Sequence, residues 1–124
     1  MKRRHGFRRD SRGLISVEFA LIAPALILFL LGIIEWGRYM YAYNTLEFGC
    51  AQAARWGVFH ITGTASAIED YAKQEMVGIT PGTVKATIDA DTNTVEVTAE
   101  MTFVFMTSAV APVPSLKITA RAKM

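Results

Sequence analysis

The sequence predicts an α+β protein with one long N-terminal helix, a short second helix and a small three-stranded antiparallel sheet. Three observations predict this fold class: an apolar run over residues 14–34, helical spacing that continues over 35–59, and alternation of apolar and polar side chains over 84–123. A helix repeats every 3.6 residues and a strand every two, so the change of period marks the passage from helix to sheet.

The apolar run is long enough to cross a membrane. Glu18 is the only charged residue among the 21 residues between Gly13 and Glu35. About 20 apolar residues span the roughly 30 Å hydrocarbon core, and a lone span must be helical because lipid offers its backbone no hydrogen bonds. We therefore divide the chain into a basic cytoplasmic leader (1–13), a transmembrane helix (14–35) and an extracytoplasmic helix with an α+β domain (36–124).

The positive charge is concentrated before the span. Six of the 13 basic residues precede Gly13, beside the single acid Asp10, and the rest of the chain is net acidic. The sequence pI of about 8.9 therefore does not indicate a nucleic-acid-binding surface. Basic residues beside a span instead predict a cytoplasmic N-terminus. A secretory signal peptide is disfavoured, because its apolar region is usually about 7 to 15 residues long and ends at a small-residue cleavage site.

Glu18 lies about one turn inside the apolar run, where a charged carboxylate is energetically unfavourable. Deep in a bilayer it would cost roughly 2.5 to 3.5 kcal/mol. One interpretation is an acid that extends to the nearby interface. The other is that Glu18 meets a positive partner: if the chain were cut after Gly13, Leu14 would carry a new α-ammonium one helical turn away.

A basic leader, a glycine, four residues, Glu-Phe and an apolar helix together resemble a type IV prepilin processing site. The chain is more closely similar to the TadE-like family, the pseudopilins of the tight-adherence (Flp) pilus assembly system. This resemblance rests on three segments, Arg12–Ala20, Glu35-Trp36-Gly37-Arg38 and Ala53-Ala54-Arg55-Trp56-Gly57. It covers roughly residues 12 to 57, and no diagnostic motif follows residue 60.

The resemblance implies a pilin-like fold and a role in pilus assembly. Prepilin peptidase would cut between Gly13 and Leu14, which makes Glu18 the fifth residue after the cut. Phe19 stands where major pilins of this type often carry Tyr. The processed protein would sit in the bacterial inner membrane with its C-terminal domain in the periplasm. Its partners would be prepilin peptidase, other Tad pilus subunits and assembly proteins, and membrane lipid. The chain's length favours a TadE or TadF type over the longer TadG.

Several residues of the long helix have predicted packing roles. Pro24 removes a backbone hydrogen bond inside the span and predicts a kink or local opening. Glu35 and Arg38 are spaced to form an ion pair. Trp36 and the tyrosines that follow suit either the membrane interface or contacts to the outer domain.

A stripe of small residues recurs every four positions, at Gly49, Ala53 and Gly57. Such a stripe allows close approach either to the chain's own sheet or to another helix. Arg55, beside the stripe, could extend to solvent or meet an acid on a partner. The sequence assigns no chemistry to it.

The outer domain is predicted from local signals. Ser66 and Glu69 have the spacing of a capping box before a second helix over about 66–77, and Gly78 is a plausible stop. Three alternating segments then predict strands, with a hairpin loop at 91–93. The apolar stretch 103–112 is too short for a second span. It could lie at the membrane surface or against another subunit.

Catalytic and metal chemistry find little support. Cys50 and His60 lack a third orienting group, and a lone cysteine allows no disulfide within the chain. Asp89, Asp91 and Asn93 read as a hairpin turn and not as a calcium loop. We expect no cofactor, no metal and no enzyme activity. The main alternative to a processed pseudopilin is an uncleaved single-pass anchor that presents a small periplasmic interaction domain.

Overall fold

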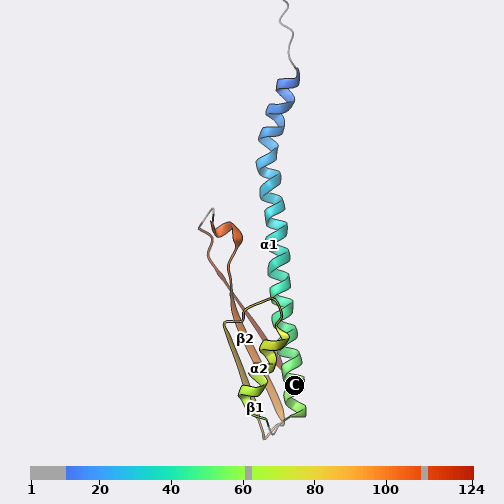
Figure 1. Ribbon diagram of the computed structural model, residues 1–124, viewed down its shortest axis with the longest axis vertical. Helices are drawn as coiled ribbons and strands as arrows, with labels where there is room; N and C mark the ends of the chain where they lie inside the picture. Colours follow the sequence, from blue (N-terminus) through green and yellow to red (C-terminus); the bar gives the residue numbers. More distant parts are fainter. Residues whose placement is uncertain (1–10, 61–62, 110–111) are drawn as a thin grey trace, which may run out of the picture. The chain divides into compact units, whose positions relative to one another are not determined.

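The computed structural model describes residues 11–60, 63–109 and 112–124 (Figure 1). Residues 1–10, most of the predicted leader, lie outside this range. The chain divides into two compact units, residues 1–34 and 35–124. The described elements are α1 (Ser11–Phe59), α2 (Ala65–Glu75), β1 (Thr83–Asp89), β2 (Thr94–Phe103), the 3₁₀ turn η1 (Met106–Ala109) and β3 (Leu116–Lys123). These elements confirm the predicted α+β class.

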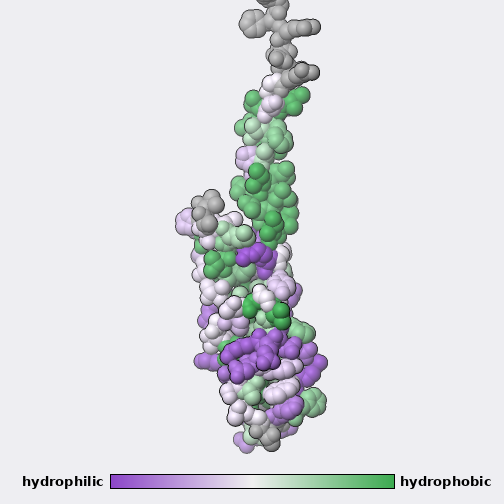
Figure 2. Space-filling model, viewed as in Figure 1, coloured by the Kyte–Doolittle hydropathy of each residue, from purple (hydrophilic) through white to green (hydrophobic). Residues whose placement is uncertain are grey.

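In the first unit, α1 carries apolar side chains that no part of the structure covers. Its most apolar 18-residue window has a mean hydropathy of 2.6, and none of that window is buried. Figure 2 shows hydrophobic residues over the visible face of this stretch. The helix continues through Pro24 without a break. A helix that is apolar on all sides and uncovered by protein has the surface expected of a membrane span.

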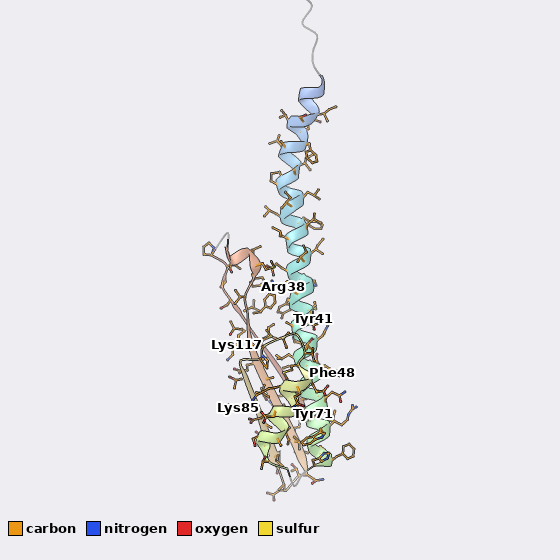
Figure 3. The ribbon with its side chains drawn as sticks, viewed as in Figure 1. Arg38, Tyr41, Phe48, Tyr71, Lys85 and Lys117 are labelled. Carbon is orange, nitrogen blue, oxygen red and sulfur yellow. The ribbon has the colours of Figure 1, made fainter. Side chains whose placement is uncertain are left out.

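The sheet of the second unit has the order β1-β2-β3, and both pairs are antiparallel. Ala86 of β1 lies opposite Val97 of β2, and Ala99 of β2 lies opposite Ala120 of β3. Because side chains alternate along a strand, this register gathers the apolar residues on one face. Lys85 and Lys117 point from the opposite face, away from α1 (Figure 3).

The distal part of α1 and α2 cover the apolar face. The buried side chains of α1 recur at helical spacing, whereas those of β2 alternate, as each period requires. The core consists of Ala42, Leu46, Cys50, Ala53, Ala54, Ile68, Ala72, Met76, Val84, Val95, Val97, Ala99, Phe103, Ile118 and Ala120. Tyr39 of α1 packs edge-on against Phe103 of β2, with ring centroids 5.8 Å apart, and the Cys50 thiol of α1 lies 3.8 Å from the carbonyl of Ala120 in β3.

The start of α2 differs from the predicted capping box. The N-cap is Thr64, which makes no side-chain capping bond; its hydroxyl lies 2.9 Å from that of Ser66. Glu69 instead accepts a hydrogen bond from the backbone N–H of Ala86, at 3.1 Å. This N–H belongs to β1, an edge strand. Leaving a half-buried donor unpaired costs free energy, so Glu69 bonds to Ala86 instead of capping α2.

Two turns show why their residues suit them. In the β1–β2 hairpin, one carboxylate oxygen of Asp89 accepts hydrogen bonds from the N–H groups of Asp91 and Thr92, and Asn93 has a φ of 55°. The hydrogen bonds to Thr92 and Asp91 hold the pKa of Asp89 below its usual value. The loop at 91–93 is therefore a hairpin, as predicted.

Gly78 has a φ of 80° and lies against the Tyr41 hydroxyl, after α2 has ended at Glu75.

Candidate functional site

The predicted processing site lies at the start of α1. The backbone of Gly13 and Leu14 is helical, and a Cβ on Gly13 would meet no atom within 4 Å. Glu18 follows Leu14 by four residues, which is about one turn of helix. Among the described residues, no ion pair involves Glu18, and its side chain is exposed. Phe19, beside it, is also exposed.

Glu35 is the first residue of the second unit and is 7% exposed. One of its carboxylate oxygens lies 2.9 Å from Nη1 of Arg38, so the ion pair that the spacing allows is present. The other oxygen accepts hydrogen bonds from the backbone N–H groups of Met106 and Thr107, the latter at 3.1 Å. Glu35 thus ties α1 to η1, a role that its neighbours in sequence do not indicate.

Arg38 links this ion pair to the end of the sheet. Its guanidinium carbon lies 5.3 Å from the centroid of the Phe103 ring, within cation–π range. Phe103 also packs edge-on against Phe105, with centroids 5.2 Å apart. A Cβ on Gly37, next to Arg38, would meet no atom within 4 Å. We call Glu35, Arg38, Phe103, Met106 and Thr107 the η1 anchor.

The aromatic residues after the apolar run divide between the two predicted roles. Tyr39 and Tyr43 are half-buried against the core, whereas Trp36 is 65% and Tyr41 is 55% exposed. The hydroxyl of Tyr41 donates a hydrogen bond to the carbonyl of Val77, at 3.0 Å. Of Trp36 and these three tyrosines, Trp36 has the most exposed ring, and no hydrogen bond from its side chain is seen among the described residues.

The small-residue stripe packs within the chain. A Cβ added to Gly49 would lie 2.5 Å from Cγ of Met76, and one added to Gly57 would lie 2.9 Å from both Ile68 and Val95. Ala53, between them, is fully buried. The two glycines therefore let α1 approach α2 and the sheet closely.

Arg55 lies on the other side of α1 and is exposed. Its neighbour Trp56 stacks between His60 and Tyr71, with ring centroids 4.3 Å and 5.2 Å away. Burial, with a smaller contribution from Glu75, raises the pKa of Tyr71. Arg55 is thus an exposed residue next in sequence to a member of this aromatic stack.

The groups with catalytic potential are not brought together. Cys50 is fully buried, and its thiol is 3.8 Å from the carbonyl of Ala120, whereas Nδ1 of His60 lies 2.9 Å from the carbonyl of Trp56. Within the described ranges, no group of three His, Cys, Asp or Glu residues could hold a metal ion. The described residues form a helix whose apolar surface suits lipid and an outer domain with a packed core.

Comparison with protein families finds a match in the N-terminal part of the chain. Residues 13–55 match the family model described as TadE-like protein. Neither a curated protein nor a solved structure matches the chain. The matched segment covers less than half of the chain, begins at Gly13 and ends at Arg55. It thus contains Glu18, the Glu35–Arg38 pair and most of the small-residue stripe, and over these residues the chain is TadE-like, as its sequence suggested.

Proposed function

We propose that the chain is a pseudopilin, or minor pilin, that assists assembly of a tight-adherence (Flp-type) pilus after prepilin peptidase cuts between Gly13 and Leu14. The family match from Gly13 onward is the observation that carries this proposal. TadE-like proteins are structural components of pilus assembly and not enzymes. The match supports involvement in Tad pilus assembly, and the processing step and the subunit role are our extension of it.

The mechanism begins with orientation and cleavage. The basic residues before Gly13 favour a cytoplasmic N-terminus in the inner membrane, and the outer domain then lies in the periplasm. Hydrolysis of the Gly13–Leu14 bond releases the leader and leaves an α-ammonium on Leu14. This step creates a positive charge at the membrane face, one helical turn from Glu18.

The new charge gives the Glu18 carboxylate a partner. Opposite charges within about 4 to 6 Å favour each other's ionised forms. The ammonium of the same chain or of a neighbouring subunit can meet Glu18, which is exposed on α1. Side-by-side contact then offsets the roughly 2.5 to 3.5 kcal/mol that an isolated acid costs deep in a membrane. The span acts as the packing stem and the outer domain binds the partner subunits.

The processing step is tested by the mass of the membrane form in cells with and without active prepilin peptidase. We expect the loss of residues 1–13 only when the peptidase is active. Gly13→Leu should block the cut, whereas Gly32→Leu, at an equally open helical glycine, should be processed normally. A full-length product in cells with a working peptidase would favour the uncleaved anchor.

The pairing step is tested by Glu18→Ala. We expect insertion and cleavage to proceed and co-purification with the other pilus subunits to fall. Glu47→Ala, which removes an exposed acid outside the span, serves as the control and should leave co-purification unchanged. Normal partner capture by Glu18→Ala would remove the charge-pairing mechanism without affecting the processing step.

A further inference from the structure

The connection between β2 and β3 presents apolar side chains to its surroundings. No charged residue occurs between Glu100 and Lys117. Val104 is 57% exposed, Met106 is 65% exposed and Val113 is 36% exposed. We call these three residues the loop surface. In Figure 1 the loop lies at the end of the sheet opposite the β1–β2 hairpin, and in Figure 2 the broad band of hydrophilic residues lies further along the domain.

The η1 anchor fixes where this loop lies along α1. Met106 and Thr107 donate their backbone N–H groups to the Glu35 carboxylate, and Glu35 is nearly buried. The ion pair with Arg38 and the position of Arg38 over Phe103 hold that carboxylate from the other side. Because η1 is bonded to the side chain of Glu35, it lies within one side-chain length of that point on α1.

Glu35 directly follows the apolar run, so this point has a defined depth. The 21 residues before it rise about 1.5 Å each, which sums to roughly the thickness of the hydrocarbon core. Glu35 therefore lies where the chain enters the headgroup layer. Trp36, the next residue, is 65% exposed and belongs to the residue type that favours this layer. Met106, the loop-surface residue bonded to Glu35, and Trp36, the residue after Glu35, are thus both placed near the membrane interface by α1.

We infer that the loop surface, together with Trp36, inserts into the lipid headgroup layer on the periplasmic side of the bilayer that α1 spans. This inference rests on the membrane insertion proposed above. Lipid is the favoured occupant because Glu35, to which η1 is bonded, directly follows the apolar run in the sequence, and because the loop surface carries no charge. The contact gives the outer domain a second attachment to the membrane and limits its tilt.

The test uses the full chain in vesicles of phosphatidylethanolamine and phosphatidylglycerol. In a Cys50→Ala background, one cysteine at a time is introduced by Met106→Cys, Leu28→Cys or Thr87→Cys and labelled with the fluorophore NBD. Leu28 lies within the span, and Thr87 is exposed on the outer face of the sheet. Quenching by iodide in water is compared with quenching by lipids that carry a nitroxide at a shallow or a deep position.

We expect the label at 106 to be quenched by the shallow nitroxide and protected from iodide, the label at 28 to be quenched by the deep nitroxide, and the label at 87 to be quenched by iodide alone. If the label at 106 behaves like that at 87 while the label at 28 is quenched by lipid, the inference is overturned and the proposed function stands. If the label at 28 escapes lipid quenching, the membrane insertion itself is wrong.

A second copy of the chain could cover the loop surface instead of lipid. In that case the label at 106 would be protected from both quenchers, and dilution of the protein in lipid would restore access; this result would also overturn the inference. The anchor is tested by adding Glu35→Ala, which should reduce the lipid quenching at 106, whereas Glu47→Ala, which removes an exposed acid of α1 outside the anchor, should leave it unchanged. Unchanged quenching in Glu35→Ala would show that the anchor does not place the loop.

Discussion

At the scale of single residues, Cys50 illustrates how burial sets chemistry. Burial raises the pKa of the Cys50 thiol from 9.0 to about 11; a hydrogen bond from the Ala99 backbone acts in the opposite sense and is weaker. The buried thiol is thus a small packing residue of the core. Its protonated form is the one that the folded domain stabilises.

This shift predicts a loss of stability at alkaline pH. The unfolded thiol releases its proton near pH 9 and the folded thiol near 11, so the contribution is fully present below pH 9 and falls between these values. It amounts to at most about 2 to 3 kcal/mol. Urea unfolding of the detergent-solubilised chain should therefore lose more stability from pH 8 to 10.5 than unfolding of Cys50→Ala. Parallel pH profiles for the two proteins would contradict this account.

Gly57 and Gly37 make a matched pair on the same helix. Alanine at Gly57 would place a methyl group 2.9 Å from Ile68 and Val95, whereas at Gly37 the same group meets nothing within 4 Å. Overpacking costs about 1 to 3 kcal/mol, and replacing a helical glycine gains about 0.5 to 1 kcal/mol. Gly57→Ala should thus destabilise the outer domain and Gly37→Ala should slightly stabilise it, as measured by urea unfolding. Equal stability of the two variants would argue against close packing at Gly57.

The small-residue stripe of α1 shows what a local sequence pattern leaves open. The four-residue spacing of Gly49, Ala53 and Gly57 indicated close approach but left the partner open, because the chain's own sheet and another helix need the same stripe. The structure identifies the partners as Met76, Ile68 and Val95. These residues are distant in sequence, and no local pattern names them.

At the scale of elements, the long periodic helices and strands could be predicted from the sequence. The side-chain hydrogen bonds that join one element to another could not. The strands followed from alternation, and the second helix ends two residues earlier than predicted, at Glu75. Glu35 bonds to Met106, 71 residues along the chain. The i, i+3 spacing of Glu35 and Arg38 predicted the partner of one carboxylate oxygen but not the partners of the other. A carboxylate that serves a distant backbone leaves no periodic signal.

Glu69 offers a test of such a tie. Its carboxylate accepts the hydrogen bond of the Ala86 N–H on the edge strand β1. Glu69→Ala leaves this half-buried donor unpaired and should cost about 1 to 3 kcal/mol, whereas Glu69→Gln keeps an acceptor oxygen and should cost less. Hydrogen exchange at Ala86 should accelerate in Glu69→Ala. If a capping role at Ser66 dominated instead, exchange would accelerate at the first turn of α2 and not in β1.

At the scale of the whole molecule, the two units of the chain have surfaces that suit different surroundings. Residues 15–34 expose apolar side chains on all sides, whereas the unit 35–124 buries its own core. A single helix serves both environments because its outer surface changes from apolar all round to a narrow buried stripe. The architecture therefore predicts that the second unit depends on α1 from Glu35 onward and does not depend on the span.

This dependence can be tested with two fragments. A fragment of residues 35–124 keeps the Glu35 anchor and all the core residues of α1, so it should be soluble and unfold cooperatively in urea. A fragment that begins at Glu47 loses Ala42 and Leu46, which are 3% and 0% exposed. Removing a large buried side chain such as that of Leu46 costs about 2 to 5 kcal/mol. This fragment should unfold at a clearly lower urea concentration or fail to fold. If both fragments unfold at the same midpoint, residues 35–46 belong to the membrane stem and not to the outer domain. If neither folds, the outer domain requires the span, and the division of the chain at Glu35 is wrong.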